Sequence, residues 1–169
     1  MAEVAADHGW LQAGRIGRPH GLDGSFLVGD PNVMLLRAAK SVWVDEVQRA
    51  IVRIAGHDGR LILRIEGCAD RSGAETLRGK LLLVPRDQAP ELEEDEWWAE
   101  DLEGLSVGDG DRMVGKVSRL LALPSCEVLE VVRDNGGEPL LVPLVSDAVR
   151  SVDLARRLID VDLRYLGED

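Results

Sequence analysis

The apolar residues of this 169-residue chain lie in short runs separated by turn signals, and this pattern constrains the fold most strongly. Runs of about four to eight residues have the length of β-strands, whereas helices of ordinary length need about ten or more. The runs that we interpret as strands or short extended segments are 11–16, 25–29, 42–44, 50–55, 61–66, 80–85, 114–121, 127–133, 139–145 and 159–163. The sequence therefore predicts a mainly β protein without a long helix.

Turn residues and one capping pattern complete this interpretation. The segments Gly-His-Asp-Gly-Arg at 56–60 and Asp-Asn-Gly-Gly at 134–137 have the composition of hairpin loops. The segment Ser-Gly-Ala-Glu at 72–75 resembles a capping box, and Gly79 follows at a distance that suits the end of a short helix. We expect one short helix here, between two strands.

A strongly acidic segment divides the chain. Residues 86–96 contain six acidic residues, one proline and one leucine, so they can bury little apolar surface. We therefore predict a first domain at 9–86, an acidic linker at 87–96 and a second domain at 97–167. Each domain suits a small β-barrel, because closing a sheet removes its unpaired edges.

The formal charge of −11 is distributed unevenly. Residues 1–88 contain 12 Lys and Arg against 11 Asp and Glu, whereas residues 89–169 contain 8 against 20. The second half would repel a phosphate backbone, and it suits a basic protein partner. The alternative is that the acidic residues only keep a small domain soluble.

The sequence offers no constellation of residues for catalysis or for metal binding. His8, His20 and His57 are far apart, and Cys68 and Cys126 stand alone, so no zinc-ligand spacing occurs. Nucleotide-binding and hydrolase motifs are also missing. We therefore expect no enzyme activity, cofactor or metal.

The hydropathy of the sequence bears on the cellular location of the protein. No apolar run approaches the ~20 residues of a membrane span. Residues 1–8 contain no Lys or Arg, which is unlike a signal peptide. We expect a soluble cytoplasmic protein without a membrane partner.

The glycine-rich segment 14–24 is a first candidate site. Four glycines and one proline predict a tightly shaped loop, and Arg15, Arg18 and His20 place hydrogen-bond donors on or beside it. Such a loop can bind a partner, or it can simply connect two strands with its arginines solvated.

The tryptophan pair Trp97-Trp98 is a second candidate site. If residues 97–102 are extended, neighbouring side chains point to opposite faces. One Trp could then seal the barrel while the other anchors a partner. The alternative is that both rings are buried between the domains.

Both segments resemble the bacterial RimM family of ribosome maturation factors. The N-terminal signature is Gly14-Arg15-Ile16-Gly17-Arg18-Pro19-His20-Gly21-Leu22 followed by Gly24. The second half resembles a PRC-barrel domain in its aromatic pair and in Asp101-Leu102, Gly104-Leu105, Val107, Gly115, Val117, Val142-Pro143-Leu144-Val145, Val149, Val152-Asp153 and Ile159-Asp160-Val161-Asp162. The resemblance extends from about Leu11 to Leu166.

The resemblance implies a translation-factor-like N-terminal β-barrel, a PRC barrel, and a non-catalytic role in ribosome assembly. Members of the family bind the immature small (30S) ribosomal subunit and assist late maturation of its head and processing of 16S rRNA. The implied partner is the nineteenth small-subunit ribosomal protein, a basic protein of the head.

The resemblance also implies roles for individual residues. The family's aromatic pair, usually two tyrosines, corresponds to Trp97 and Trp98, with Asp101 beside it. Arg15, Arg18, His20 and Gly21 are candidates for contact with RNA or with the partner. Glu103 departs from the apolar residue that the family usually has at this position.

Two alternative functions belong to other classes. The first is an RNA-binding module that grips ribosomal RNA directly through the first half of the chain. It predicts affinity for naked RNA that falls steeply with salt. The second is an enzyme that uses scattered carboxylates, which would require a polar concave pocket.

Overall fold

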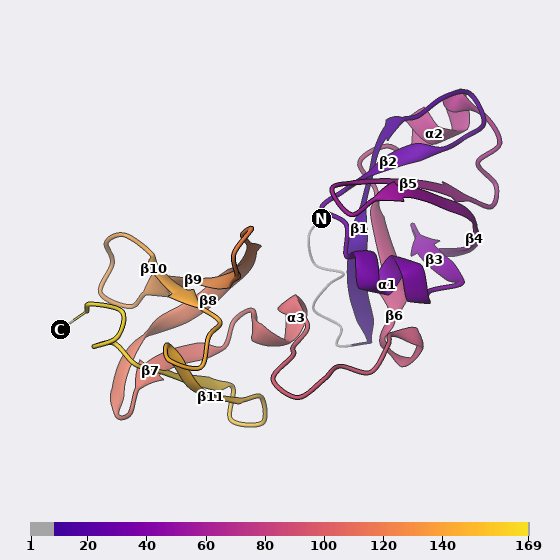
Figure 1. Ribbon diagram of the computed structural model, residues 1–169. Helices are drawn as coiled ribbons and strands as arrows, with labels where there is room; N and C mark the ends of the chain where they lie inside the picture. The colour runs from indigo at the N-terminus through magenta and orange to yellow at the C-terminus, as the bar shows by residue number, and fades with distance from the viewer. Residues whose placement is uncertain (1–8, 169) are drawn as a thin grey trace. The chain divides into compact units, whose positions relative to one another are not determined.

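The computed structural model describes residues 9–168 and consists of two compact units, with the boundary between Glu93 and Glu94 (Figure 1). Both units are built on β-sheets, and the helices are short, so the predicted mainly β, two-unit fold is confirmed. The boundary falls within the acidic segment, where residues 89–98 form neither helix nor strand. Each unit is described separately below.

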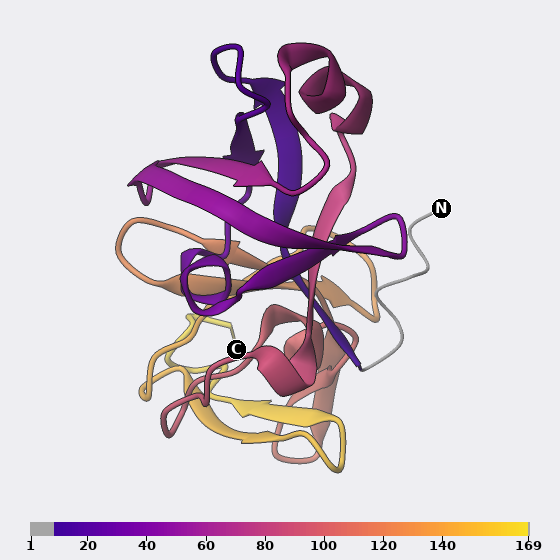
Figure 2. The same cartoon turned by 90° about the vertical axis from the view of Figure 1, so that its right-hand side faces the viewer.

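The first unit is a closed six-stranded antiparallel barrel with the strand order β1-β2-β5-β4-β3-β6 (Figure 2). Its strands are β1 (Trp10–Pro19), β2 (Phe26–Gly29), β3 (Ser41–Val44), β4 (Val47–His57), β5 (Arg60–Ile65) and β6 (Leu81–Pro85). Closure leaves no unpaired edge, which protects the sheet from pairing with other chains.

Alternation along the strands fills the interior of this barrel. Leu11 and Ala13 of β1 are fully buried, and so are Leu61 and Leu63 of β5, each with one more exposed residue between them. This period of two places every second side chain inside. Phe26 of β2 is the largest fully buried side chain. The predicted hairpin at 56–60 is confirmed, because β4 pairs with β5 through His57 and Arg60.

Two short α-helices and a 3-10 turn, η2 (Arg86–Gln88), complete the described part of the first unit. Helix α1 (Val33–Ala38) was not predicted; it begins at Asn32, whose Oδ1 accepts a hydrogen bond from Leu35 N–H at 3.1 Å. Helix α2 (Arg71–Leu77) lies where the short helix was expected, but the assigned capping box is wrong. The cap is Asp70, whose carboxylate accepts a hydrogen bond from Gly73 N–H at 2.8 Å. An aspartate in extended backbone caps a helix as well as serine does.

The second unit contains a six-stranded sheet with the order β10-β9-β8-β7-β12-β11, which curls into a half-barrel. Its elements are α3 (Ala99–Leu102), β7 (Ser106–Asp109), β8 (Arg112–Ala122), β9 (Glu127–Arg133), β10 (Leu140–Pro143), β11 (Val149–Asp153) and β12 (Leu158–Val161). Strands β7 and β12 pair in parallel, and the other neighbours are antiparallel. The predicted hairpin around 134–137 joins β9 and β10.

The core of the second unit is formed by apolar side chains on the inner face of this curled sheet. Leu102 of α3 and Leu105 are almost fully buried with residues from all six strands or the segments next to them. Trp97 is partly buried and packs against this same cluster. Trp97 therefore lies at the margin of this apolar core.

Candidate functional site

The loop between β1 and β2, residues 20–25, is held in one conformation by local hydrogen bonds. The backbone N–H of His20 donates to the carbonyl of Ser25 at 2.8 Å, and the N–H of Ser25 donates to the Asp23 carboxylate at 3.1 Å. Hydrogen bonds from Ser25, with the charge of Arg64, hold the pKa of Asp23 below its ordinary value. Such preorganisation is what a binding loop needs, because little conformational entropy remains to be lost.

Two glycines of the signature permit close contacts between backbone segments. A Cβ on Gly17 would lie 2.5 Å from the carbonyl oxygen of Leu27, and a Cβ on Gly24 would lie 2.1 Å from that of Cys68. Gly24 also has φ +86°, a left-handed conformation that other residues rarely adopt. The Cys68 thiol donates to the Gly24 carbonyl at 3.2 Å. These glycines therefore shape the barrel itself.

The structure separates the four predicted loop residues into different roles. Arg15 donates from Nη1 to the carbonyl of Gly79 at 2.7 Å, which ties β1 to the segment before β6. Arg18 and His20 are exposed. The carbonyl of Gly21 accepts a hydrogen bond from Arg71 at 3.4 Å. Arg18 and His20 are thus the members of this group whose side chains are available to a partner.

Three further residues beside the loop were not found from the sequence. Leu22 is 79% exposed at the loop, the largest exposure among the large apolar side chains described. Arg53 and Arg64 are register partners on β4 and β5, and their guanidinium groups lie 3.7 and 4.0 Å from the Asp23 carboxylate. Only the cross-strand register places these arginines next to the loop, so no local sequence signal could have assigned them.

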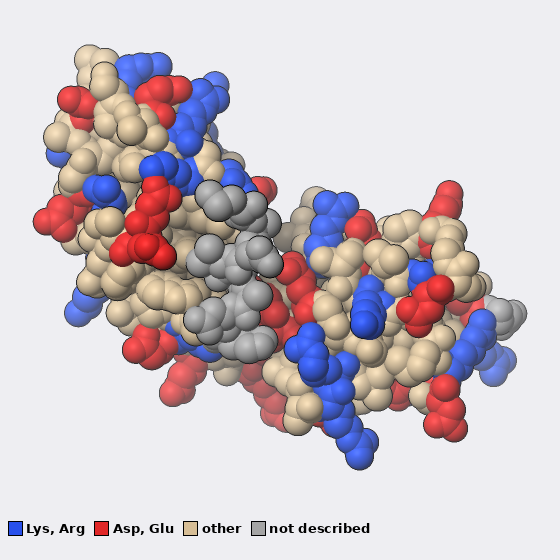
Figure 3. All heavy atoms as spheres, turned by 180° about the vertical axis from the view of Figure 1, so that it is seen from behind, with Lys and Arg blue, Asp and Glu red and all other residues tan. Residues whose placement is uncertain are grey.

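We call the surface made by these residues the basic loop surface. Figure 3 shows Lys and Arg side chains toward the end of the first unit that carries α2 and the β1–β2 loop in Figure 1. The members of the surface are Arg18, His20, Leu22, Arg53, Arg64 and Arg71. It combines an exposed apolar side chain with guanidinium donors.

The tryptophan pair precedes α3 in the second unit. Trp98 is 6% exposed, and its backbone is extended, with φ −74° and ψ 143°. Trp97 is more exposed than Trp98 and packs against the core described above. The condition that 97–102 is extended holds only up to Trp98, because Ala99–Leu102 is helical. Acidic residues in its first turn favour the helix, since its N-terminus carries partial positive charge.

Asp101 belongs to α3. Its backbone N–H donates to the carbonyl of Trp98 at 3.0 Å, so the short helix links the position of Asp101 to that of Trp98. The Asp101 side chain is partly buried. Glu100 and Asp101 follow the pair directly, and Glu96 precedes it, so the two rings lie in an acidic sequence environment.

The described residues also bear on metal binding and on membrane spanning. Within residues 9–168, no three His, Cys, Asp or Glu side chains are grouped so that they could hold a metal ion. The helices of this part of the chain are all too short or too polar to cross a bilayer. His8 lies outside the described residues.

These observations define a class: a two-unit β protein with a closed N-terminal barrel, a C-terminal half-barrel and an aromatic pair where the second unit begins. Residues 11–89 match the RimM N-terminal domain, and residues 99–165 match the RimM PRC barrel domain. The chain belongs to the RimM family, which confirms the resemblance stated from its motifs.

Relatives match the chain over most of its length. A protein of Frankia alni is 37% identical over 168 residues, covering 90% of this chain and 93% of the relative. A protein of Sorangium cellulosum is 35% identical over 155 residues, covering 86% and 90%. Both are named ribosome maturation factor RimM. A crystal structure from Pseudomonas aeruginosa, described as a putative 16S ribosomal RNA processing protein RimM, is 26% identical, with a TM-score of 0.43 and coverage of 90% and 96%.

Proposed function

We propose that this chain is a non-catalytic assembly factor that acts on the immature small ribosomal subunit in the cytoplasm. It binds the nineteenth small-subunit ribosomal protein through Trp97, Trp98 and Asp101, and it promotes late maturation of the head and processing of 16S rRNA. The names of its relatives support the ribosomal role. The observation that carries the proposed contact is an aromatic pair within the acidic unit.

Charge supports a basic protein as the partner. Glu94, Asp95 and Glu96 come directly before the pair, and Glu100 and Asp101 follow it. Residues 89–169 contain 20 acidic against 8 basic residues. An acidic surface speeds encounter with a basic protein and repels other acidic proteins. The same charge opposes a broad grip on the phosphate backbone by this unit.

Trp97 is the residue that we assign as the main anchor. Its ring rests on the core of the second unit, so the side chain is held in place, and part of it remains exposed. Large aromatic side chains dominate the binding energy of protein interfaces. Trp98 is buried. We assign it two roles: it positions Trp97 and α3, and it completes the surface that contacts the partner.

The test is the affinity of Trp97→Ala for purified small subunits. Loss of one anchor should weaken binding by about 30- to 1000-fold, which corresponds to roughly 2–4 kcal/mol. Tyr165→Ala is the control, because it removes another exposed aromatic ring, 54% exposed, from the same unit. Far-UV circular dichroism confirms that each variant is folded. Unchanged affinity of a folded Trp97→Ala variant would contradict the assignment.

The basic loop surface favours a second function, direct contact with ribosomal RNA through Arg15, Arg18, His20 and Gly21 or their neighbours. The observation in its favour is that exposed Leu22 immediately precedes Asp23, whose carboxylate lies within 4.0 Å of the guanidinium groups of Arg53 and Arg64. Apolar side chains can insert between bases while arginines contact phosphates.

This second function has its own test. If RNA is the ligand, the chain binds naked 16S rRNA fragments, and the logarithm of the affinity falls linearly with the logarithm of the salt concentration. The double variant Arg53→Gln/Arg64→Gln reduces both the affinity and that slope. The Arg119→Gln variant removes an arginine of the second unit and changes neither. Absence of binding to naked RNA at moderate salt rejects direct RNA contact.

A further inference from the structure

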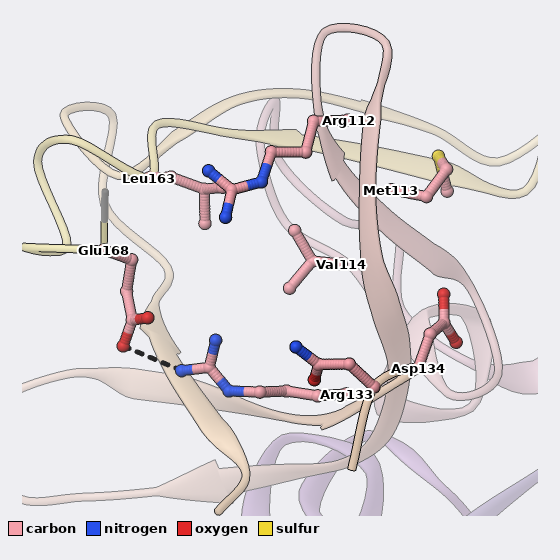
Figure 4. A pocket seen from close by; sticks show the side chains of 8 residues that line it. Arg112, Met113, Val114, Arg133, Asp134, Leu163 and Glu168 are labelled. Carbon is pink, nitrogen blue, oxygen red and sulfur yellow. Dashed lines mark hydrogen bonds and ion pairs between the residues drawn. The ribbon is translucent and has the colours of Figure 1, made fainter. Parts of the chain in front are cut away.

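A small cavity in the second unit lies apart from the tryptophan pair in sequence and has two arginines among its lining residues (Figure 4). Its volume is about 120 Å³. Arg112 stands at the start of β8 and Arg133 at the end of β9, two neighbouring strands of the sheet. In Figure 4 the guanidinium groups of Arg112 and Arg133 lie on opposite sides of the cavity, with Val114 between them and Leu163 beside Arg112. The cavity therefore has a mainly polar lining, in which the two arginines are accompanied by the carboxylates of Asp134 and Glu168 as well as a few apolar side chains.

Arg133 is fixed before any ligand arrives. Its Nε–H donates to the carbonyl of Glu138 at 3.0 Å, and Nη2 donates to the carboxylate of Glu168 at 2.7 Å. The arginine side chain is only 22% exposed. When an oxyanion replaces Glu168, the hydrogen bond from Nε to the Glu138 carbonyl still holds the guanidinium, so little rotamer freedom is lost. This arrangement is more restrained than that of a freely solvated surface arginine.

The chain's own Glu168 supplies a carboxylate to this cavity. The backbone N–H of Glu168 donates to the carbonyl of Leu163 at 2.9 Å, which turns the segment back toward the cavity. The hydrogen bond from Arg133, with the charges of Arg133 and Arg112, holds the pKa of Glu168 below its ordinary value. The cavity thus already binds one oxyanion group, and both arginines favour its charged form.

The Glu168 carboxylate leaves the hydrogen-bond donors of Arg112 without a bond to it. Within residues 9–168 Glu168 accepts a hydrogen bond from Arg133 but not from Arg112, on which it acts only through charge. A planar carboxylate has two oxygens, whereas a tetrahedral phosphate presents oxygens in more directions and carries up to two charges. A phosphate group can therefore accept hydrogen bonds from arginines on two walls at once.

We propose that this cavity binds the phosphate group of a small phosphorylated molecule between Arg112 and Arg133, and that Glu168 occupies the site until the ligand displaces it. Glu168 is then an internal competitor that lowers the apparent affinity. Asp134 also lines the cavity, and the second half of the chain is strongly acidic. This charge disfavours a long polyanion such as RNA and leaves a single phosphate group as the fitting ligand.

The experiment titrates inorganic phosphate into the full chain at constant ionic strength. Calorimetry and the NMR shifts of backbone amides measure binding during this titration. Glu168→Gln keeps the size of the side chain but removes its charge. It should bind phosphate about tenfold more tightly than the unaltered chain, because the competing state is removed. Adding Arg112→Gln to this variant should abolish the gain.

The chain offers a matched control in Arg119 and Glu130, an ion pair at 2.9 Å that bridges the same two strands. Glu130→Gln should leave phosphate binding unchanged. The proposal is overturned if folded Glu168→Gln shows no amide shifts at about 10 mM phosphate. It is overturned equally if Arg112→Gln has no effect. Tighter binding of Glu168→Gln to single-stranded RNA but not to phosphate would assign the arginines to nucleic acid and would also contradict it.

Discussion

At the residue scale, the glycines of the N-terminal signature are explained by packing as much as by binding. Gly17 and Gly24 stand where a Cβ would overlap a backbone carbonyl of a neighbouring segment. Their spacing in the sequence is sufficient to predict a tightly shaped loop. The identity of the opposing carbonyls depends on contacts between distant segments, and no local pattern contains that information.

Gly24→Ala is the sharpest test of this explanation. The left-handed backbone costs about 1–2 kcal/mol for a residue with a Cβ, and overlap with the Cys68 carbonyl adds about 1–3 kcal/mol. Gly79→Ala is a matched control, because Gly79 has φ +87° in the same unit and open space around it. Urea unfolding should therefore show a larger loss of stability for Gly24→Ala than for Gly79→Ala. Equal losses would show that the close contact with Cys68 is unimportant.

The candidate site residues were only partly accessible to sequence reasoning. The tryptophan pair is conspicuous because the chain has four tryptophans in all, and two of them are adjacent. Trp97 packs on the core, and Trp98 is the more buried ring. The alternation of side chains along a strand could not predict this arrangement. The reason is that Ala99–Leu102 is helical, so the period of two ends at Trp98.

At the element scale, most strands follow from their apolar runs and α2 was expected from its flanking residues, whereas helices α1 and α3 were not predicted. Helix α1 has six residues and α3 has four, and neither is long enough to show a helical period. The pattern of apolar residues could not predict the parallel pairing of β7 with β12 either, because the two strands are far apart in sequence.

An arginine connects three elements of the second sheet. Arg150 on β11 contacts Asp109 of β7 at 2.7 Å and Asp160 of β12 at 3.4 Å. It also lies 3.3 Å from Asp162 and donates to the carbonyl of Val161 at 2.8 Å. The Asp109 carboxylate accepts a further hydrogen bond from Leu163 N–H at 3.1 Å. This network ties the edge strand β11 to the parallel pair.

The network predicts a specific pH dependence of stability. Hydrogen bonds from Arg150 and Leu163 hold the pKa of Asp109 below its ordinary value of 3.8. A carboxyl with a lowered pKa in the folded state stabilises the fold above the pKa of the unfolded state, about 3.9, and this contribution is lost as the pH falls through the folded pKa. Asp109→Asn should therefore lower the unfolding temperature at pH 7 and reduce the further drop on acidification.

Thermal unfolding at pH 7 and at about pH 3 measures this effect. Arg156→Gln is the control, because Arg156 contacts Asp153 at 3.8 Å with its side chain 80% exposed. Exposed pairs of this kind contribute little to stability. If Asp109→Asn and the unaltered chain lose the same stability on acidification, Asp109 is not the group that titrates.

At the scale of the whole molecule, the two units differ in charge, and this difference bears on function. The first 88 residues are close to neutral, whereas the remainder carries all of the net negative charge. Composition alone makes this visible, and the family models assign the two parts to different domains of one family. The basic loop surface lies in the first unit and the acidic tryptophan pair in the second.

The charge difference predicts the kinetics of association. If the acidic second unit meets a basic ribosomal protein, the association rate should fall as salt rises from about 50 to 300 mM, while the dissociation rate changes less. Glu94→Gln/Asp95→Asn should lower the association rate and weaken its salt dependence. Glu75→Gln, on α2 in the first unit, should change neither. Stopped-flow measurements with purified small subunits provide both rates.

The most direct test of the proposed function is sedimentation of the purified chain through a sucrose cushion with separated small subunits, large subunits and whole ribosomes. The account predicts that the chain sediments with free small subunits and with neither of the other two particles. Absence from all three particles, or equal association with large subunits, would contradict the proposal that this chain is an assembly factor of the small subunit.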